Sequence, residues 1–345
     1  MTRNNLKAID FFCSGGGMTY GLRLAGVDVI AGIDNDPSVQ ETYERNNPDS
    51  KFILADIFKF NEKDLREKTG IKQNDDDLIF IGCSPCQYWS IIHTDRTKSE
   101  ITKDLLKEFH RFVKFFRPGF VVIENVPGLQ RQSTESGLQE FIDDLKKHGY
   151  IVSYDIYNLN NYGVPQSRKR FSLIASRVVP KKILPKVSPN RLVVRDVLGE
   201  ANGFPRVEAG HRDSTSFQHT VSRLSEENLL AIRATPKNGG NTIKRRISYK
   251  GSGFRDSYGR MSWDKPAPTI TTNFHKLSSG RFGHPEEDRA ISLREGASLQ
   301  TFPKEYIFYA NSISAIAKMI GNAVPPEFAK RIALAIIESL EDYEE

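Results

Sequence analysis

A cysteine in a predicted strand-end loop is the first candidate for chemistry in this sequence. The apolar run of residues 78–82 is followed by Cys83-Ser-Pro-Cys86-Gln87, so Cys86 lies just beyond the end of an expected strand. Loops at the carboxyl ends of strands in open α/β sheets form the crevice in which ligands bind. Because a cysteine thiolate can add covalently to a substrate, Cys86 is a candidate nucleophile.

Cys83 and Cys86 also have the C-x-x-C spacing of zinc sites and of thioredoxin-like redox pairs. A structural zinc ion needs four ligands, whereas the sequence adds only Cys13 and seven scattered histidines. A redox pair would need a thioredoxin-like βαβ context, which the surrounding pattern does not match. Three cysteines in 345 residues, without a signal peptide, favour a reducing cytosol over disulfides. We therefore expect Cys83 to be a packed thiol and Cys86 the reactive one.

The positive charge of the chain is concentrated in one segment. Hydrophobic residues make up 38% and charged residues 27%, which is typical of a soluble globular protein. No apolar run approaches the ~20 residues that span a bilayer. The net charge is only +6, yet residues 181–285 carry 19 Lys and Arg against 8 Asp and Glu. This segment is either a solvated basic surface or a domain that binds a polyanion.

Residues 8–177 alternate between strand and helix patterns, which predicts a Rossmann-like α/β fold with a mostly parallel sheet and helices on both faces. Helical spacing is clearest over residues 103–116 and recurs around 139–147. Beyond Pro180, abundant Gly, Ser, Arg and Asn predict a smaller, loop-rich and mostly β domain, until helical spacing returns at residues 326–340. The strand candidates are residues 8–12, 28–34, 52–56, 78–82, 120–126 and 170–177.

Three of these strands end in groups that suit an adenosyl ligand. The first leads into Cys13-Ser-Gly-Gly-Gly17, a turn whose backbone can approach a ligand at a helix N-terminus. Asp34 ends the second strand and Asp56 the third, where carboxylates can accept hydrogen bonds from a ribose or an adenine amino group. Each acid alone could be a helix cap. Their combination favours an adenosyl ligand, while the turn lacks the G-x-G-x-x-G spacing of nicotinamide sites.

An acid and two arginines are further candidates. Glu124 ends an apolar strand, where a carboxylate is costly unless it has a partner. It is either a satisfied half-buried group or an acid that acts on the substrate of Cys86. Arg168 and Arg170 lie two residues apart, where they form either a solvated strand edge or a clamp for an oxygen or a phosphate.

Taken in order, these motifs resemble those of the cytosine-C5 DNA methyltransferase family of the bacterial restriction-modification type. The resemblance covers nearly the whole chain outside the basic segment, and it implies the S-adenosylmethionine-dependent methyltransferase fold. It also implies methylation of a cytosine in duplex DNA, with S-adenosylhomocysteine as product and no metal. The matching segments are residues 10–17, 85–87 with 90, 124–126, 166–170, 263–272, 294–303 and 321–325.

The resemblance assigns a role to each candidate catalytic residue. Cys86 would add to carbon 6 of a flipped-out cytosine and so activate carbon 5 for methylation. Glu124 would address the ring nitrogen N3 and the exocyclic amine. Arg170 would hold the O2 carbonyl, and Arg168 would support the nucleophile loop and the thiolate.

Cofactor and DNA contacts are also implied by the resemblance. Phe12 would pack on adenine and Asp34 would bind the ribose, although Ser14 stands where the family usually has glycine. The implied cofactor residues are Phe12, Ser14, Gly15, Gly16, Gly17, Asp34, Asn35, Asp56, Ile57, Pro85, Asn322 and Val324. The expected DNA contacts are Gln87, Ser90, Lys244, Arg245, Arg246, Arg255 and Arg260.

These assignments predict a catalytic domain over residues 1–183, a target-recognition domain and hinge over 184–314, and a C-terminal helix within 315–345 that returns to the catalytic domain. We expect a monomeric cytoplasmic protein, nucleoid-associated through DNA and without membrane contact, which acts alone or beside a restriction endonuclease. Three alternatives stay open: a tRNA cytosine methyltransferase, a non-catalytic DNA-binding relative and a nicotinamide oxidoreductase. The basic segment favours DNA over tRNA.

Overall fold

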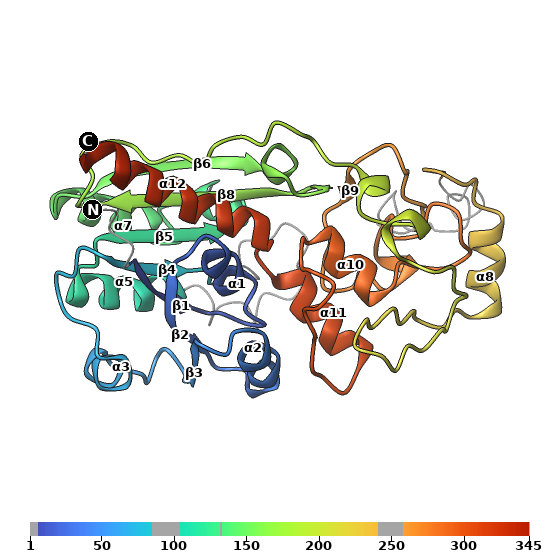
Figure 1. Cartoon of the computed structure of the whole chain (residues 1–345), viewed down its shortest axis with the longest axis horizontal. Helices are drawn as coiled ribbons and strands as arrows, with labels where there is room; N and C mark the ends of the chain where they lie inside the picture. Colours follow the sequence, from blue (N-terminus) through green and yellow to red (C-terminus); the bar gives the residue numbers. More distant parts are fainter. Residues whose placement is uncertain (1–5, 85–103, 132, 241–257, 345) are drawn as a thin grey trace. The chain divides into compact units, whose positions relative to one another are not determined.

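The computed structural model of the chain describes residues 6–84, 104–131, 133–240 and 258–344 (Figure 1). The chain divides into two compact units. Unit 1 comprises Met1–Asn158, Lys169–Val187 and Pro326–Glu345, and unit 2 comprises Leu159–Arg168 and Ser188–Pro325. The C-terminal residues from Pro326 therefore belong to the same unit as the N-terminal half, whereas residues 315–325 belong to unit 2.

Unit 1 is built on a seven-stranded sheet with the order β3-β2-β1-β4-β5-β8-β6. The strands from β3 to β5 run parallel, and β8 is antiparallel to both of its neighbours. All six predicted strands are present, which confirms the mostly parallel sheet. The strands are β1 (Lys7–Phe11), β2 (Asp28–Asp34), β3 (Lys51–Leu54), β4 (Leu78–Gly82), β5 (Phe120–Asn125), β6 (Ile151–Asn158) and β8 (Lys169–Ser176).

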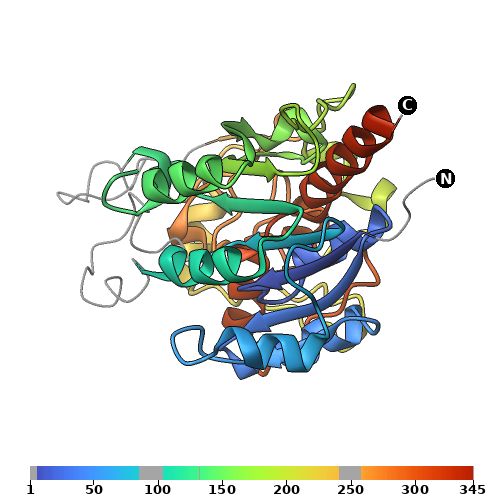
Figure 2. The same cartoon turned by 90° about the vertical axis from the view of Figure 1, so that its left-hand side faces the viewer.

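Helices cover both faces of this sheet, as predicted. In Figure 2 the green and teal helices α7 and α5 lie on one side of the sheet, and the red helix α12 lies on the other. The predicted helices at 103–116, 139–147 and 326–340 correspond to α5, α7 and α12. The helices among the described residues of unit 1 are α1 (Gly17–Leu24), α2 (Gln40–Asn46), α3 (Glu62–Thr69), α5 (Leu105–Phe116), α6 (Gly128–Arg131), α7 (Leu138–Lys147) and α12 (Pro326–Glu344), with the 3-10 turn η1 (Pro37–Val39).

An aromatic core holds α5 against the sheet. Phe11 of β1 packs against Phe109 and Phe112 of α5, with ring centroids 5.2 and 5.1 Å apart. On the opposite face α1 and α12 approach so closely that a Cβ on Gly21 would lie 2.3 Å from the carbonyl oxygen of Pro326. A glycine at position 21 is therefore what allows the C-terminal helix to return to this sheet.

Unit 2 is loop-rich, as predicted, but the expectation of a mostly β domain is wrong for its described residues. The strands found there are β7 (Gln166–Ser167) and β9 (Ala267–Pro268), which pair in parallel. Buried arginines such as Arg260 and Arg294 donate to backbone carbonyls, so loops satisfy their polar groups without a strand ladder. The remaining elements are η2 (Leu159–Tyr162), η3 (Val194–Asp196), η4 (Glu200–Asn202), α8 (Glu226–Arg233), η5 (Leu277–Ser279), α10 (Leu293–Leu299) and α11 (Ile313–Asn322).

Candidate active site

The strand order of unit 1 places a ligand crevice at the carboxyl ends of β1 and β4. The chain leaves β1 toward β2 and β3 and then returns to pair β4 with the other side of β1, which makes this edge a topological switch point. Phe11 and Gly82 are register partners, and the Cys83 amide donates to the Phe11 carbonyl at 3.4 Å. The glycine-rich turn and the segment leading to Cys86 therefore begin side by side. Cys86 itself lies outside the described residues, as do Pro85, Gln87 and Ser90.

The turn after β1 has an unusual backbone. Phe12 and Ser14 have φ angles of 64° and 46°, in the left-handed region that few residues other than glycine adopt. Ser14 thus takes the conformation that a glycine would favour at this position. Helix α1 begins after Gly16 (φ 84°) without a side-chain cap, and a helix N-terminus of this kind suits an anionic group. Strained backbone clusters at ligand sites, which supports this turn as a binding element.

Asp34 fastens the end of β2 to the same turn. Its Oδ2 accepts a hydrogen bond from the Ser14 amide at 2.8 Å, and its Oδ1 accepts one from the Asp36 amide at 2.9 Å. Burial raises the pKa of Asp34, while these backbone hydrogen bonds oppose the shift. The carboxylate is half-buried, and Asn35 beside it is exposed. A carboxylate oxygen accepts more than one hydrogen bond, so Asp34 fits a ligand hydroxyl.

The end of β3 carries the second predicted adenosyl contact. Asp56 is half-buried, its Oδ1 accepts a hydrogen bond from the Phe58 amide at 3.1 Å, and Ile57 beside it is buried. β2 and β3 are adjacent parallel strands, so the residues after their carboxyl ends share one edge of the sheet. The strained turn, the uncapped helix and the two acids together fit an adenosyl ligand with a charged methionine part.

Glu124 is brought together with one of the two predicted arginines. The Glu124 side chain is 8% exposed on β5, and its Oε1 lies 3.2 Å from Nε of Arg170 on the neighbouring strand β8. Next to it, the Asn125 amide donates from Nδ2 to the carbonyl and hydroxyl oxygens of Ser84 at 3.1 and 3.2 Å. The acid is therefore ion-paired, and its neighbour is tied to a residue two positions before Cys86.

Arg168 lies in unit 2 and does not form a solvated strand edge. It is 2% exposed, and its Nη1 donates to the Ile270 carbonyl at 2.9 Å. Its Nη2 donates to the carbonyls of Gly321 and Ala323 at 3.3 and 3.2 Å, on either side of Asn322. Arg168 thus holds the segment that carries the predicted cofactor residues Asn322 and Val324.

The expectation that Arg260 contacts DNA is wrong. Arg260 is 1% exposed, and its guanidinium donates to the carbonyls of Thr235, His284 and Ile232 at 3.1, 3.1 and 2.8 Å. These hydrogen bonds, with an ion pair to Asp288, use the donors that a phosphate would need. The other predicted basic contacts, Lys244, Arg245, Arg246 and Arg255, lie outside the described residues.

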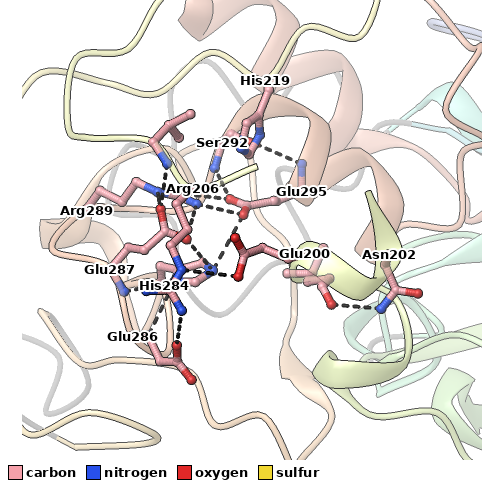
Figure 3. Close-up of polar contacts among 12 residues, drawn as sticks. Glu200, Asn202, Arg206, His219, His284, Glu286, Glu287, Arg289, Ser292 and Glu295 are labelled. Atoms are coloured by element: carbon pink, nitrogen blue, oxygen red, sulfur yellow. Dashed lines mark hydrogen bonds and ion pairs between the residues drawn. The ribbon is translucent and has the colours of Figure 1, made fainter. Parts of the chain in front are cut away.

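Glu295 of the Arg294-Glu295 motif is part of a buried ionic cluster in unit 2 (Figure 3). Glu295 is fully buried and receives two hydrogen bonds from Arg289, at 2.7 and 2.9 Å, and a third from the Ser292 amide at 2.7 Å. Ser292 in turn caps α10 and contacts His219. Burial lowers the pKa of the nearby His284 to about 4, so this imidazole is neutral at physiological pH. Glu295 therefore stabilises unit 2.

A buried polar chain beneath the glycine-rich turn was not expected from the sequence. Asp10 Oδ2 accepts a hydrogen bond from Thr19 Oγ1 at 2.7 Å, Thr19 Oγ1 lies 3.1 Å from the Tyr43 hydroxyl, and that hydroxyl lies 2.7 Å from Ser50 Oγ. The only sequence signal was an acid inside the apolar strand β1. Burial raises the pKa of Asp10 to about 7 despite its hydrogen bond with Thr19.

Asp10 is expected to make the stability of unit 1 pH-dependent. Because its pKa is raised from 3.8 to about 7 in the folded state, the folded protein holds a proton that the unfolded chain releases. The stabilisation that this proton gives to the folded state is complete below pH 4. It is lost as the pH rises toward 7, by up to about 1.4 kcal/mol per pH unit. The free energy of unfolding in urea at pH 4.5, 6 and 7.5 measures this slope. Asp10→Asn should flatten it, and an unchanged slope would contradict the assignment.

The described residues contain neither a metal-binding cluster nor a membrane-spanning helix. Within residues 6–84, 104–131, 133–240 and 258–344, no group of three or more His, Cys, Asp or Glu side chains is arranged to hold a metal ion. Over the same ranges, no helix combines the length and apolar character needed to cross a membrane.

Known proteins similar to this chain identify its family. The family model for the C-5 cytosine-specific DNA methylase matches residues 6–338. The chain is 39% identical to the Type II methylase M.HgiDII of Herpetosiphon aurantiacus over an alignment of 349 positions, which covers 98% of this chain and 96% of that protein. It is 30% identical to the Type II methyltransferase M1.HphI of Haemophilus parahaemolyticus, over 97% of this chain and 87% of that one.

Solved structures support the same fold. The chain resembles a crystal structure of a prophage-encoded E. coli protein assigned as a DNA modification methyltransferase, with a TM-score of 0.78 at 22% identity. The likeness covers 98% of this chain and 100% of that one. Because the family model spans nearly the whole sequence and two relatives match at 30% identity or more, the chain belongs to the C-5 cytosine-specific DNA methylase family and is a DNA cytosine-5 methyltransferase.

Proposed function

We propose that this DNA cytosine-5 methyltransferase takes its methyl group from S-adenosylmethionine and acts through a covalent bond between Cys86 and carbon 6 of a flipped-out cytosine. The observation that carries most weight is the pairing of the buried Glu124 with Arg170. Asn125 beside this pair is hydrogen-bonded to Ser84, at the start of the segment that leads to Cys86. A nucleophile, an acid and an oxygen-binding cation are the groups that this chemistry needs.

Each proposed catalytic residue acts on a different part of the cytosine ring. The Cys86 thiolate forms a bond to carbon 6, and the displaced electron pair moves into the ring toward N3 and O2. Glu124 supplies a hydrogen bond or a proton at N3, and the Arg170 guanidinium stabilises charge at O2. Carbon 5 then bonds to the methyl carbon as the bond between that carbon and the cofactor sulfur breaks, and a proton given to N3 returns to Glu124. Loss of the carbon-5 proton expels the thiolate and restores the aromatic ring.

The cofactor is proposed to bind at the strand ends of unit 1. S-adenosylmethionine, when bound, supplies an electrophilic methyl group on a sulfonium and leaves as S-adenosylhomocysteine. The turn of residues 12–17 would hold the methionine part, Asp34 the ribose, and Asp56 with Ile57 the adenine. The resemblance to the family adds four further residues to the proposed cofactor site: Asn35, Asn322, Val324 and Pro85. The support for this placement is the strained turn and its hydrogen bond to Asp34.

Double-stranded DNA is the proposed partner, with the basic residues 181–285 contributing phosphate contacts. The two relatives described above are named Type II enzymes. We therefore propose a role beside an independently acting restriction endonuclease or as a solitary modifier. The protein would act as a monomer in the cytoplasm, on the DNA of the nucleoid, without a metal.

Methylation mapping tests this function directly. Cells that lack cytosine methylation and express the protein should acquire 5-methylcytosine at one short sequence, which bisulfite sequencing identifies. In vitro, label from S-adenosylmethionine should enter duplex DNA and not tRNA. Glu124→Gln should lower the rate by about 10²-fold or more, because general acid catalysis is lost. Label in tRNA alone would contradict the proposal.

A further inference from the structure

The turn between β3 and α3 accepts hydrogen bonds from Arg111 of helix α5, and these hydrogen bonds are called the brace below. Within residues 56–60 the amides of Lys59 and Phe60 both donate to the Asp56 carbonyl at 2.9 Å, which closes one helical turn. The carbonyls of Ile57 and Phe60 both accept hydrogen bonds from Arg111 Nη2, the first at 2.6 Å. One guanidinium nitrogen of α5 therefore holds two carbonyls of a turn about fifty residues earlier in the chain.

The guanidinium that forms this brace is itself fixed in place. Arg111 Nη1 donates to Glu62 at 2.8 Å, at the start of α3, and Nε donates to Glu108 at 2.7 Å, one turn earlier in α5. The Arg111 side chain is 31% exposed, and its guanidinium carbon lies 4.3 Å from the centre of the Phe112 ring. Two carboxylates and one ring thus hold the group in a single orientation, so Arg111 joins α5 to both ends of the turn.

We propose that Arg111 is a positioning residue for the adenine part of the cofactor. This inference rests on the proposed function, in which Asp56 and Ile57 of the turn address adenine. Without Arg111, two carbonyls of the turn lose a charged donor, and the turn keeps only its internal hydrogen bonds. A binding turn that must be ordered during binding has a lower affinity than one that is already rigid.

The test compares two arginines that have similar partners at different places in unit 1. In Arg111→Met the side-chain stem remains and the donors are lost. The matched control is Arg177→Met, because Arg177 also donates to a carbonyl, that of Arg117 at 2.9 Å, and pairs with Asp76. Asp76 precedes β4, at the amino end of the parallel strands and away from the carboxyl ends. Both variants lose one half-buried arginine, but only the first loses the brace.

Isothermal titration calorimetry with S-adenosylmethionine, S-adenosylhomocysteine and adenosine gives the first readout. Arg111→Met should bind all three about 10-fold or more weakly, because all three carry the adenine. Arg177→Met should bind them as the wild type does, at a temperature where both variants are folded. A loss confined to S-adenosylmethionine, or an equal loss in both variants, would overturn the proposal.

Hydrogen exchange of the protein without cofactor gives the second readout. Amides of residues 58–60 should exchange about 10-fold faster in Arg111→Met and at the wild-type rate in Arg177→Met. Unchanged exchange would overturn the brace itself. If the wild type bound neither S-adenosylmethionine nor S-adenosylhomocysteine, the proposed function would fail together with this inference, whereas wild-type binding that Arg111→Met retains would defeat the inference alone.

Discussion

Cys86→Ser is expected to abolish methyl transfer, with a fall in rate of about 10³-fold or more, whereas Cys83→Ser should keep most of the activity. A serine hydroxyl is a far weaker nucleophile than a cysteine thiolate at neutral pH. The pKa of the Cys83 thiol is raised by burial, and the charges of Glu124 and Asp10 raise it further. Cys83 is therefore protonated and unreactive at physiological pH. Initial rates with labelled S-adenosylmethionine and duplex DNA measure the difference.

The two serine variants control for each other, since the same atom is exchanged at positions three residues apart. Trapping with DNA that contains 5-fluorocytosine adds an independent readout, because fluorine at carbon 5 prevents release of the enzyme. Wild type and Cys83→Ser should form a covalent adduct that survives denaturation, and Cys86→Ser should form none. Equal loss of activity in both variants would show that Cys83 is not merely a packed thiol.

The sheet and its strand-end residues could be predicted because each is marked by a local change from apolar to polar residues or glycine. An apolar run that stops at a polar or glycine residue marks the carboxyl end of a buried strand, and Asp34 and Glu124 stand at such points. β6 was missed because it is an edge strand, in which exposed and buried positions alternate irregularly.

Contacts made by arginines could not be predicted in the same way. Arg260 lies beside a strongly basic segment, and its sequence signal is the same whether it binds a phosphate or buried carbonyls. Only the fold decides between these roles, because it determines whether the guanidinium reaches the surface. The role of Arg111 could not be predicted either, because it is one polar position on an amphipathic helix. Its hydrogen-bond partners belong to a turn that is distant in sequence.

Replacing Glu295 with leucine is expected to destabilise unit 2 by about 3 kcal/mol or more, because it removes one partner of a buried ion pair. Arg289 would lose two hydrogen bonds and would keep those that it donates to Glu287. Arg289→Met should be comparably harmful, since it leaves the Glu295 carboxylate buried without its cation. Urea unfolding followed by Trp263 fluorescence in a Trp89→Phe background reports on unit 2.

The double variant Arg289→Met/Glu295→Leu separates the ion pair from the surrounding packing. Because both charges disappear together, it should be less destabilised than the sum of the single variants by at least about 1 kcal/mol. Burial alone would raise the pKa of Glu295, but the charge and hydrogen bonds of Arg289 lower it well below its ordinary value of 4.5. The stabilisation from Glu295 is therefore present above pH 4.5 and is lost as the pH falls. The free energy of unfolding of the wild type should fall more steeply in acid than that of the double variant. If the two pH curves ran parallel and the effects of the single substitutions were additive, the two residues would be acting independently.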